Sequence, residues 1–235
     1  MNTVPMAQSP ACPIVTIDGP SGSGKGTIGR AVAREVGWHL LDSGALYRLV
    51  ALAGAVAGLR PEDEPGHAAL AARMDVKFTV ARDGGELISL AGRDVTAAIR
   101  SEEVGQGASR VAAWQGVREA LLARQRAFAV PPGLVADGRD MGTVVFPGAE
   151  LKIFLTATPQ ERALRRHKQL KDKGSDVSLP ALSREIAERD LRDRTREVAP
   201  LKAAPDACVI DSTGLSVERV VRRVLELGAA RRLWS

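Results

Sequence analysis

Residues 14–27 decide the fold, and they read Ile14-Val-Thr-Ile-Asp-Gly-Pro-Ser-Gly-Ser-Gly-Lys-Gly-Thr27. The apolar run at 14–17 predicts a buried strand, and apolar residues at 28, 32 and 36 predict a helix that starts close to Thr27. The loop between them matches the pattern G-x-x-x-x-G-K, which has meaning when a strand precedes it and a helix follows it. The sequence therefore predicts a loop that holds the phosphates of a nucleotide.

Each residue type in this loop has a chemical task. Glycines let consecutive backbone N–H groups converge on phosphate oxygens, and the start of the helix adds a partial positive charge. Lys25 adds a compact full charge that can follow the β- and γ-phosphates. Gly26 stands where Ser or Thr usually follows the lysine, so Thr27 is the candidate Mg²⁺ ligand. The predicted ATP-binding residues are Gly19, Pro20, Ser21, Gly22, Ser23, Gly24, Lys25, Gly26 and Thr27.

Four more short apolar runs follow along the chain, at 38–41, 134–136, 151–155 and 208–210. Each run ends at Asp, Gly or Thr, and helical patterns fill the gaps, which is typical of βαβ units. Together with 14–17 these runs predict a three-layer α/β fold of the P-loop NTPase class, with a five-stranded parallel sheet flanked by helices. We expect this core to take in residues 13–71 and 109–235.

The stretch at 72–108 breaks this alternation and predicts an insertion. Val76–Val80 and Leu87–Leu90 alternate or run apolar on either side of Asp83-Gly84-Gly85, which is a hairpin signal. We expect a small antiparallel region here, and a surface excursion without a role is the alternative. Residues 1–12 show no such pattern and are expected to form a flexible extension.

Two helices in the C-terminal half are marked by their ends. Thr158-Pro-Gln-Glu161 has the pattern of a helix start, and Gly174 is expected to close that helix. The last helix has an apolar stripe that begins at Val217 and is expected to stop at Gly228. The first of these helices is strongly basic without an aromatic residue, which predicts a solvated face made of Arg162, Arg165, Arg166, Lys168 and Lys171.

The bulk composition is that of an ordinary globular protein of 235 residues, with 45% hydrophobic and 26% charged residues. A net charge of +5 and a pI near 9.6 indicate anionic partners, and nucleic acids and phosphorylated metabolites both qualify. Cys12 and Cys208 form neither a disulfide framework nor a cysteine metal pattern. No run approaches the roughly 20 apolar residues of a membrane span, so we expect a cytoplasmic protein without a membrane partner.

Two segments that follow predicted strands contain charged residues, and both are expected to lie at the same edge of the sheet as the phosphate loop. The segment 41–48 places Arg48 just over one helical turn beyond Ser43, and the alternative role of Ser43 is to cap the following helix. The segment 136–142 gathers two Asp residues and Arg139 at a strand end. Because the carboxyl ends of parallel strands meet at one edge, a second phosphorylated molecule could bind there.

A helix predicted at 179–198 changes character along one face. Its apolar positions 179, 182 and 186 are followed on the same face by Arg189, Asp193 and Arg196. This change indicates a helix that leaves the core and overhangs a polar cleft, whereas a solvated, salt-bridged helix end is the alternative. We expect a short helical lid over 174–200.

These charges favour a kinase. Phosphoryl transfer between two nucleotides depends mainly on positioning and on neutralising several negative charges, and arginine suits that task because its planar fork binds phosphate and stays charged. An acceptor phosphate has a second pKa of about 6, so it is largely deprotonated near neutral pH and needs no general base.

Four segments in this order resemble the bacterial cytidylate kinases. They are Ile17-Asp-Gly-Pro-Ser-Gly-Ser-Gly-Lys-Gly-Thr27, Trp38-His-Leu-Leu-Asp-Ser-Gly-Ala-Leu-Tyr-Arg48, Asp137-Gly-Arg-Asp-Met-Gly-Thr-Val-Val-Phe-Pro147 and Arg189-Asp-Leu-Arg-Asp-Arg-Thr-Arg196. The resemblance runs along nearly the whole chain. It implies Mg²⁺-dependent phosphoryl transfer from ATP to CMP and dCMP, with a monophosphate-binding part in the 72–108 insertion and a lid.

The resemblance also implies individual roles. By similarity, Arg48 and Arg139 would hold the acceptor phosphate, and Ser43 would line the acceptor site. The residues implied to read the cytosine are Ser109, Arg118 and Asp140, with Arg196 nearby, and those implied to contact the ribose are Arg189 and Asp193. The expected catalytic residues are Lys25, Arg139 and Arg189.

Other functions stay open on the residues alone. An adenylate or shikimate kinase would share the phosphate loop, although the Asp-Gly-Arg-Asp segment at 137–140 and the insertion speak against both. A nucleic-acid-binding ATPase would fit the basic pI but should show a basic stripe with aromatic residues. A phosphate sensor without turnover is a third alternative. We expect a monomer whose partners are ATP and CMP or dCMP, and not nucleic acid.

Overall fold

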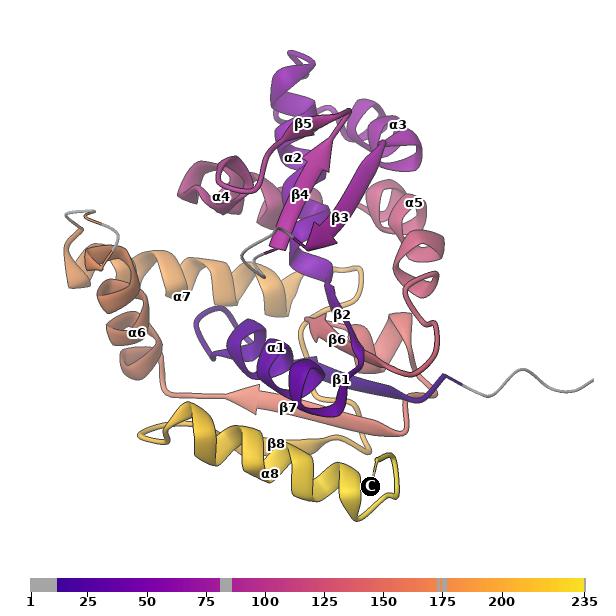
Figure 1. Ribbon diagram of the computed structural model, residues 1–235. Helices are drawn as coiled ribbons and strands as arrows, with labels where there is room; N and C mark the ends of the chain where they lie inside the picture. The colour runs from indigo at the N-terminus through magenta and orange to yellow at the C-terminus, as the bar shows by residue number, and fades with distance from the viewer. Residues whose placement is uncertain (1–11, 81–85, 173, 175–176, 235) are drawn as a thin grey trace, which may run out of the picture.

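The computed structural model describes residues 12–80, 86–172, 174 and 177–234. A five-stranded, fully parallel sheet lies at its centre, in the strand order β2-β6-β1-β7-β8 (Figure 1). The strands are β1 (Ile14–Asp18), β2 (His39–Asp42), β6 (Leu134–Gly138), β7 (Leu151–Thr156) and β8 (Cys208–Asp211). These are the five apolar runs of the sequence, so the predicted parallel sheet is confirmed.

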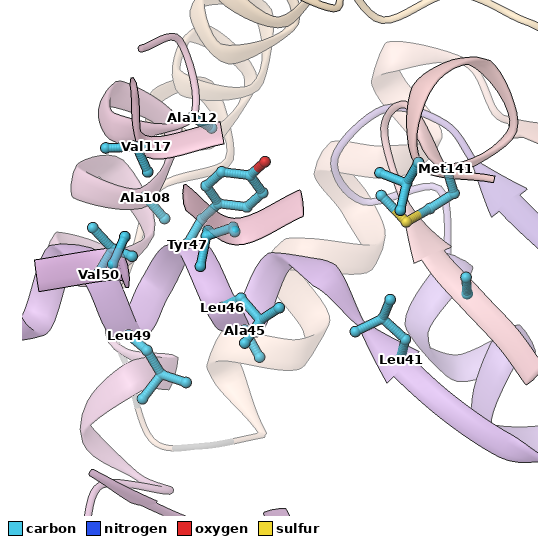
Figure 2. Close-up of a cluster of buried hydrophobic side chains, with 14 of the residues drawn as sticks. Leu41, Ala45, Leu46, Tyr47, Leu49, Val50, Ala108, Ala112, Val117 and Met141 are labelled. Carbon is cyan, nitrogen blue, oxygen red and sulfur yellow. The ribbon is translucent and has the colours of Figure 1, made fainter. Parts of the chain in front are cut away.

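The two faces of the sheet are covered by different helices because alternate side chains of a strand point to opposite faces. Val15 and Ile17 pack in a core with α1 (Lys25–Val36) and α8 (Val217–Ala229). Leu134 and its neighbours on the other face pack with helices α2 (Ser43–Val56), α4 (Glu102–Val111) and α5 (Gln115–Arg126). Figure 2 shows the centre of this second core, with Tyr47 among its apolar side chains. The predicted three-layer arrangement is thereby confirmed.

A small antiparallel sheet packs against the second core. It consists of β3 (Val76–Val80), β4 (Glu86–Leu90) and β5 (Arg93–Asp94), and Ile88 of β4 is fully buried among the helices. The antiparallel pairing of the first two strands is confirmed, whereas the two-residue β5 was too short to be predicted. The predicted turn at Asp83-Gly84-Gly85 and residues 1–11 of the extension predicted at 1–12 lie outside the described residues. Two short elements flank this sheet, α3 (Glu64–Arg73) and the 3₁₀ turn η1 (Ala98–Arg100).

Helices α6 (Pro159–Lys171) and α7 (Leu179–Thr195) pack against each other and extend beyond the edge of the main sheet (Figure 1). In α7, Leu182 and Ile186 are buried and Arg192 and Arg194 are exposed, as the predicted face requires. The helix ends three residues earlier than predicted because Arg196 has an extended backbone, with ψ at 139°. Arg196 therefore belongs to the segment that follows α7.

The structure rules out the alternative capping role of Ser43 and shifts the predicted end of the last helix. The residue that caps α2 is Asp42, whose Oδ1 accepts from the N–H of Ala45 at 3.1 Å, while Ser43 is the first helical residue. Gly228 does not stop α8, which continues to Ala229. A Cβ at Gly228 would lie 1.9 Å from the ring of Trp234, so this glycine allows close packing of the C-terminal indole.

Among the described residues, no helix combines the length and the apolar character needed to cross a membrane.

Candidate active site

The phosphate loop connects the end of β1 to the start of α1. Gly22 and Gly24 have positive φ angles of 76° and 94°, which residues with a Cβ rarely adopt. A Cβ at Gly19 would lie 2.0 Å from the carbonyl oxygen of Leu155, so this position also requires glycine. Gly24 caps α1, so the free N–H groups of the first helical turn face the loop. The loop therefore has the geometry of an anion site.

Lys25 is buried at the base of this loop, and its Nζ donates to the carbonyl oxygen of Pro20 at 2.9 Å. Burial, followed by the charge of nearby Arg139, lowers the pKa of Lys25 to about 7. An ammonium held among other cations gains stability when an anion binds beside it. A nucleotide phosphate at this loop would therefore favour the charged lysine.

A cavity of about 200 Å³ opens between the phosphate loop, α2, α4 and α7. Ser21, Gly22 and Lys25 line one end of it. All nine residues predicted for the acceptor line the same cavity: Ser43, Arg48, Ser109, Arg118, Arg139, Asp140, Arg189, Asp193 and Arg196. Residues far apart in the sequence thus converge beside the loop, at the carboxyl ends of the parallel strands.

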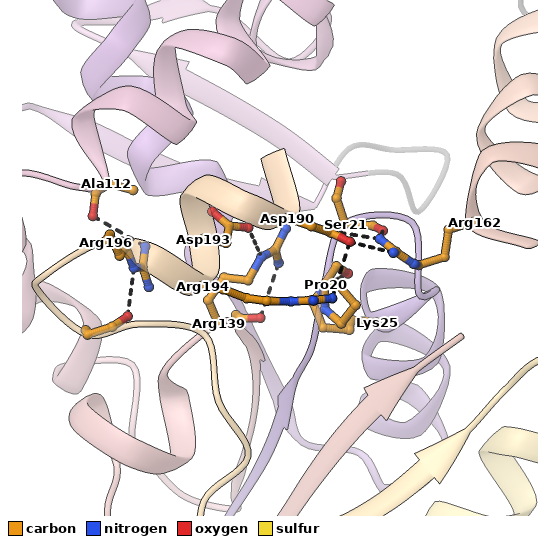
Figure 3. Close-up of polar contacts among 12 residues, drawn as sticks. Pro20, Ser21, Lys25, Ala112, Arg139, Arg162, Asp190, Asp193, Arg194 and Arg196 are labelled. Atoms are coloured by element: carbon orange, nitrogen blue, oxygen red, sulfur yellow. Dashed lines mark hydrogen bonds and ion pairs between the residues drawn. The ribbon is translucent and has the colours of Figure 1, made fainter. Parts of the chain in front are cut away.

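Two ion pairs organise this cavity, which we call the acceptor cavity. The Nε of Arg139 donates to Oδ2 of Asp193 at 2.9 Å (Figure 3). Burial alone would raise the pKa of Asp193, but the adjacent Arg139 lowers it below its usual range. The second pair joins Arg118 to Asp140, and Arg118 also donates to the carbonyl oxygen of Ala112 at 3.1 Å. These bonds fix the guanidinium and carboxylate groups before any ligand enters.

Several polar atoms in the acceptor cavity are buried without a hydrogen-bond partner among the residues that the structure describes. They are Ser109 Oγ, Arg189 Nε and Arg196 Nη2. Leaving a buried polar group unsatisfied costs about 1–3 kcal/mol, so such groups in a cavity indicate a polar ligand. Burial, and then the nearby charge of Arg139, lowers the pKa of Arg189 to about 10. The cavity therefore favours a ligand with negative charge.

Arg48 connects the acceptor cavity to the small antiparallel region. Its Nη1 donates to the carbonyl oxygens of Ile99, at 2.7 Å, and Ser101, at 3.1 Å. A Cβ at Gly105 would lie 2.9 Å from the Arg48 guanidinium, so α4 packs directly against this side chain. The position of Arg48 thus depends on the turn between η1 and α4.

A second cavity of about 390 Å³ lies on the other side of the phosphate loop. Thr27 lines it from the loop side, and Leu215 and Val220 supply an apolar wall. Arg165 of α6 donates through Nη1 to Ser212 Oγ at 3.0 Å and through Nη2 to the Ser212 carbonyl oxygen at 2.6 Å. A half-apolar space beside a phosphate loop suits the nucleoside part of a nucleotide. We call it the donor cavity.

The structure also corrects the predicted solvated face of α6. Arg162 is only 1% exposed and forms an ion pair with Asp190 of α7. Arg165 lies against Ser212 and the backbone of the phosphate loop, where it contacts the Ser23 carbonyl oxygen at 3.4 Å. A charge pattern on a helix cannot reveal which of its arginines meet a partner from another element. Only the outer part of α6 is solvated, including Lys168.

Comparison with known proteins decides the family. The family model for cytidylate kinase matches residues 15–230. The chain belongs to the cytidylate kinase family. The cytidylate kinase of Azotobacter vinelandii is 58% identical over 221 residues, which is 94% of this chain and 96% of that protein. The cytidylate kinase of Bordetella bronchiseptica is 57% identical over 224 residues, 95% of this chain and 98% of its own length.

A gluconokinase from Sinorhizobium meliloti has a TM-score of 0.46 at 18% identity and covers 94% of this chain and 93% of its own. The assignment to the cytidylate kinase family rests on the sequence relatives and on the family model. It confirms the resemblance predicted from the four motif segments.

Two carboxylates of this cytidylate kinase site were missed in the sequence. Asp18 is buried at the end of β1, and its two oxygens accept from the N–H groups of Met141 and Gly142, each at 2.8 Å. It thereby holds the turn that follows Arg139. Burial raises the pKa of Asp18 to about 6. An Asp at a strand end is typical of any turn, so no signal in the sequence distinguished it.

Asp137 is the second missed carboxylate, and it lies beside the phosphate loop. Its Oδ2 is 3.2 Å from where a Cβ would stand on Gly26, and burial raises the pKa of Asp137 to about 7. Its place in the 137–140 segment was noticed, but no role followed from it. Tyr47 was likewise not predicted as a site residue, although it lines the acceptor cavity.

The oxygen atoms near the loop fit a magnesium ion that arrives with a nucleotide. No group of three or more His, Cys, Asp or Glu side chains could hold a metal ion in the part of the chain that the structure describes. Mg²⁺ in kinases is usually bound by one or two protein oxygens, by substrate phosphates and by water. Thr27 lines an open groove together with Lys25 and Gly26, and Oδ2 of Asp137 lies 3.2 Å from the position of a Cβ on Gly26, so these two side chains could offer such oxygens.

Proposed function

We propose that this protein transfers a phosphoryl group from ATP to CMP and dCMP, giving CDP and dCDP. The observation that carries this proposal is the acceptor cavity, in which a phosphate loop with Lys25 meets a cluster of five arginines. Such a concentration of cations is costly to hold in a fold unless an anionic ligand binds there. Family membership supports cytidine monophosphates as the ligand.

On the donor side, residues 19–27 would hold the triphosphate of ATP. The backbone N–H groups at the start of α1 and the ammonium of Lys25 point to the same space, which suits the β- and γ-phosphates. The nucleoside would occupy the donor cavity, with the base against Leu215 and Val220.

On the acceptor side, Arg48 and Arg139 would hold the phosphate of CMP. Both residues line the acceptor cavity, and each guanidinium is already fixed by protein hydrogen bonds. Asp193 and Arg189 would contact the ribose, with Ser43 lining the same part of the cavity. We assign these roles from the resemblance to the cytidylate kinases, and all of these residues line the acceptor cavity.

The far wall would read the cytosine. A cytosine edge offers an amino donor and two acceptors, N3 and O2, so a site for it needs a fixed carboxylate and fixed donors. Asp140 and Arg118 form such a pair, and the unpartnered Ser109 Oγ and Arg196 Nη2 lie on the same cavity wall.

The reaction itself requires positioning and charge neutralisation. Lys25, Arg139 and Arg189 would stabilise the charge on the phosphoryl group in flight, because all three face the junction between the loop and the acceptor cavity. The acceptor phosphate attacks in its deprotonated form, so no protein base takes part. Thr27 and Asp137 would hold Mg²⁺, which would neutralise charge on the donor phosphates.

The two mobile parts proposed for such a kinase have structural support here. Arg48 is bonded to Ile99 and Ser101, so the 72–108 region would move together with an acceptor-phosphate ligand. Helix α7 in the 174–200 region supplies Arg189 and Asp193, so a lid would close onto the acceptor. We propose that the protein works as a monomer, because one chain supplies every group named.

The test is ADP formation from Mg-ATP with CMP, dCMP, UMP, AMP or shikimate supplied separately. Fast turnover with CMP and dCMP and little with the others is expected. Turnover only with another acceptor would retain the phosphate loop but reject the cytosine contacts. ATP hydrolysis stimulated by single-stranded RNA, without acceptor-dependent turnover, would favour a nucleic-acid-binding ATPase. Omission of Mg²⁺ with excess chelator should abolish transfer.

A further inference from the structure

One buried ion pair lies outside both cavities and joins α6 to α7. Arg162 donates through Nη1 to Asp190 Oδ1 at 3.0 Å and through Nη2 to Asp190 Oδ2 at 2.5 Å (Figure 3). Both side chains are buried, and the guanidinium is almost completely removed from solvent. None of the roles assigned above uses either residue.

The same guanidinium is bonded to the phosphate loop. Arg162 Nη1 also donates to the carbonyl oxygen of Ser21 at 2.9 Å, and its Nε donates to the carbonyl oxygen of Ala157 at 3.1 Å. A Cβ at Gly22 would lie 3.1 Å from Cβ of Arg162, so the loop packs directly on α6. Arg162 therefore holds the backbone of the loop at Ser21 and packs against Gly22, and both of these residues line the acceptor cavity.

Asp190 is placed on the helix that contributes to the other substrate site. It follows Arg189 directly and precedes Asp193 by three residues, and both of these line the acceptor cavity. Because a helix moves as a rigid element, a shift of α7 carries the Asp190 carboxylate with it. The path from loop to acceptor thus runs from Ser21 through Arg162 and Asp190 to α7.

We propose that Arg162 and Asp190 are positioning residues that couple the donor site to the acceptor site, so that a substrate bound at one site orders the other. This inference rests on the proposed function in one respect, namely that Arg189 and Asp193 contact the acceptor. Neither residue of the pair touches a reacting atom. Their effect is exerted through the phosphate loop and through α7.

The chemistry of the pair supports coupling over simple stabilisation. Replacing a buried ion pair by apolar residues is often neutral for stability, so such a pair is weak evidence for a stabilising role. Here the arginine divides its donors between a loop carbonyl and a carboxylate on another element, and its planar fork fixes both directions at once. If the phosphate loop or α7 shifts, the guanidinium of Arg162 can no longer keep its hydrogen bonds to both the Ser21 carbonyl oxygen and the Asp190 carboxylate.

The experiment measures thermodynamic coupling in the full-length protein. The affinity for CMP is measured by calorimetry without and with a saturating non-hydrolysable ATP analogue, and the ratio of the two dissociation constants is the coupling factor. Linked sites typically differ by about 5- to 150-fold in this ratio. We expect a factor above about 5 for the wild type, because the link transmits ordering.

Two variants and one control probe the link. Arg162→Lys keeps the positive charge but loses the planar guanidinium that bonds to two partners. Asp190→Asn keeps the shape of the side chain but loses its negative charge. Both should reduce the coupling factor to within about twofold of one and lower kcat by more than about tenfold, while affinity for CMP alone changes by less than about threefold. Arg194→Gln removes an exposed charge 3.7 Å from the same carboxylate and should leave the factor unchanged.

A purely structural pair would give a different result. Folded variants with the wild-type coupling factor would overturn the proposal, as would a wild-type factor near one. Absence of acceptor-dependent turnover in the wild type would instead reject the proposed function, so the two failures are distinguishable. Melting temperatures establish whether each variant is folded.

A measurement on the wild type alone covers the case in which the variants do not fold. CMP without ATP should slow amide hydrogen exchange in α6 at residues 160–171. In the described part of the chain, none of these residues lines the acceptor cavity, so protection there is transmitted by neighbouring elements. Asp190 of α7 reaches the N-terminal half of α6 at Arg162, and Glu102 of α4 reaches the helix at Arg166, so protection that includes residues 160–163 is the result expected of the pair. Unchanged exchange in α6 would contradict the coupling.

Discussion

Replacement of Arg139 by alanine separates the acceptor role from the donor role. A planar guanidinium that grips a phosphate makes two charge-assisted hydrogen bonds, each worth about 1.5–3 kcal/mol. Arg48 remains in the variant and retains part of the binding, so we expect a loss of about 2–4 kcal/mol. That corresponds to roughly 30- to 1000-fold in kcat/KM for CMP, at about 1.4 kcal/mol per tenfold change.

The same change should affect ATP little. Arg139 is one of the charges that lower the pKa of Lys25, so its removal raises that pKa and keeps the lysine cationic. We therefore expect the KM for ATP to change by less than about threefold. Asp193 loses its 2.9 Å partner but still has Arg189 nearby, so the folded state should lose about 1–3 kcal/mol.

A coupled assay of ADP formation, with each substrate varied against a saturating amount of the other, measures both effects. Arg139→Lys is the matched control, because it keeps the charge but not the fork, and it should fall between the wild type and the alanine variant. Equal losses for CMP and ATP in a folded variant would refute the acceptor role and place Arg139 on the donor side.

Three further outcomes are expected. Lys25→Ala should remove most turnover through lost charge at the transferred phosphate while leaving the melting temperature within a few degrees; near-normal turnover would exclude the phosphate-loop mechanism. Asp18, whose pKa is raised from 3.8 to about 6, binds more protons in the folded than in the unfolded state, so its contribution to stability should fall by about 2 kcal/mol as pH rises from 4 to 6. Carboxyl NMR checks this, and titration of Asp18 near 4 would contradict it. Gly228→Ala should lower the melting temperature by several degrees, because its Cβ would overlap the ring of Trp234, whereas Gly148→Ala, with nothing within 4 Å, should not.

The sheet could be predicted because its physical cause is local. Runs such as 14–17 and 151–155 must bury both faces in a parallel sheet, and a continuous apolar run records this directly in the sequence. The phosphate loop could be predicted for a similar reason, since the positive φ angles at Gly22 and Gly24 restrict those positions to glycine. In the strands and in the loop, the type of residue is restricted by its own burial or its own backbone angles, so the sequence shows the restriction directly.

The rest of the site depends on partners that are distant in the sequence. Arg162 was predicted to be solvated because its helix is basic, and only the packing of α7 shows that Asp190 neutralises it. Asp18 holds a turn 123 residues away, which no local pattern records. Gly228 is predicted to end a helix, whereas the structure shows that a glycine is required there because the indole of Trp234, six positions later, packs against it. The spacing of residues predicts which faces of a helix or strand are polar or apolar. Whether a given polar residue is exposed or buried depends on the element that packs against it.

The electrostatics of the acceptor cavity explain why so many charges can be held together before a substrate arrives. Each of the most constrained arginines has its own carboxylate, Asp193 for Arg139 and Asp140 for Arg118, so these pairs are neutral and keep the cavity folded. Lys25 and Arg189 lack such close pairing among the described residues, and the pKa of each is lowered.

Burial also lowers the pKa of Arg48 and of Arg196, so the unfavourable energy is shared among four cations, and the part carried by Lys25 and Arg189 lies at the junction of the two substrates. Phosphate charge relieves it where transfer occurs, because a neighbouring anion raises the pKa of both groups back toward ordinary values. A neutral ligand of the same shape gains nothing from this relief. Binding at the junction would thus depend on phosphate, and in the proposed function the paired arginines would set the position and identity of the acceptor.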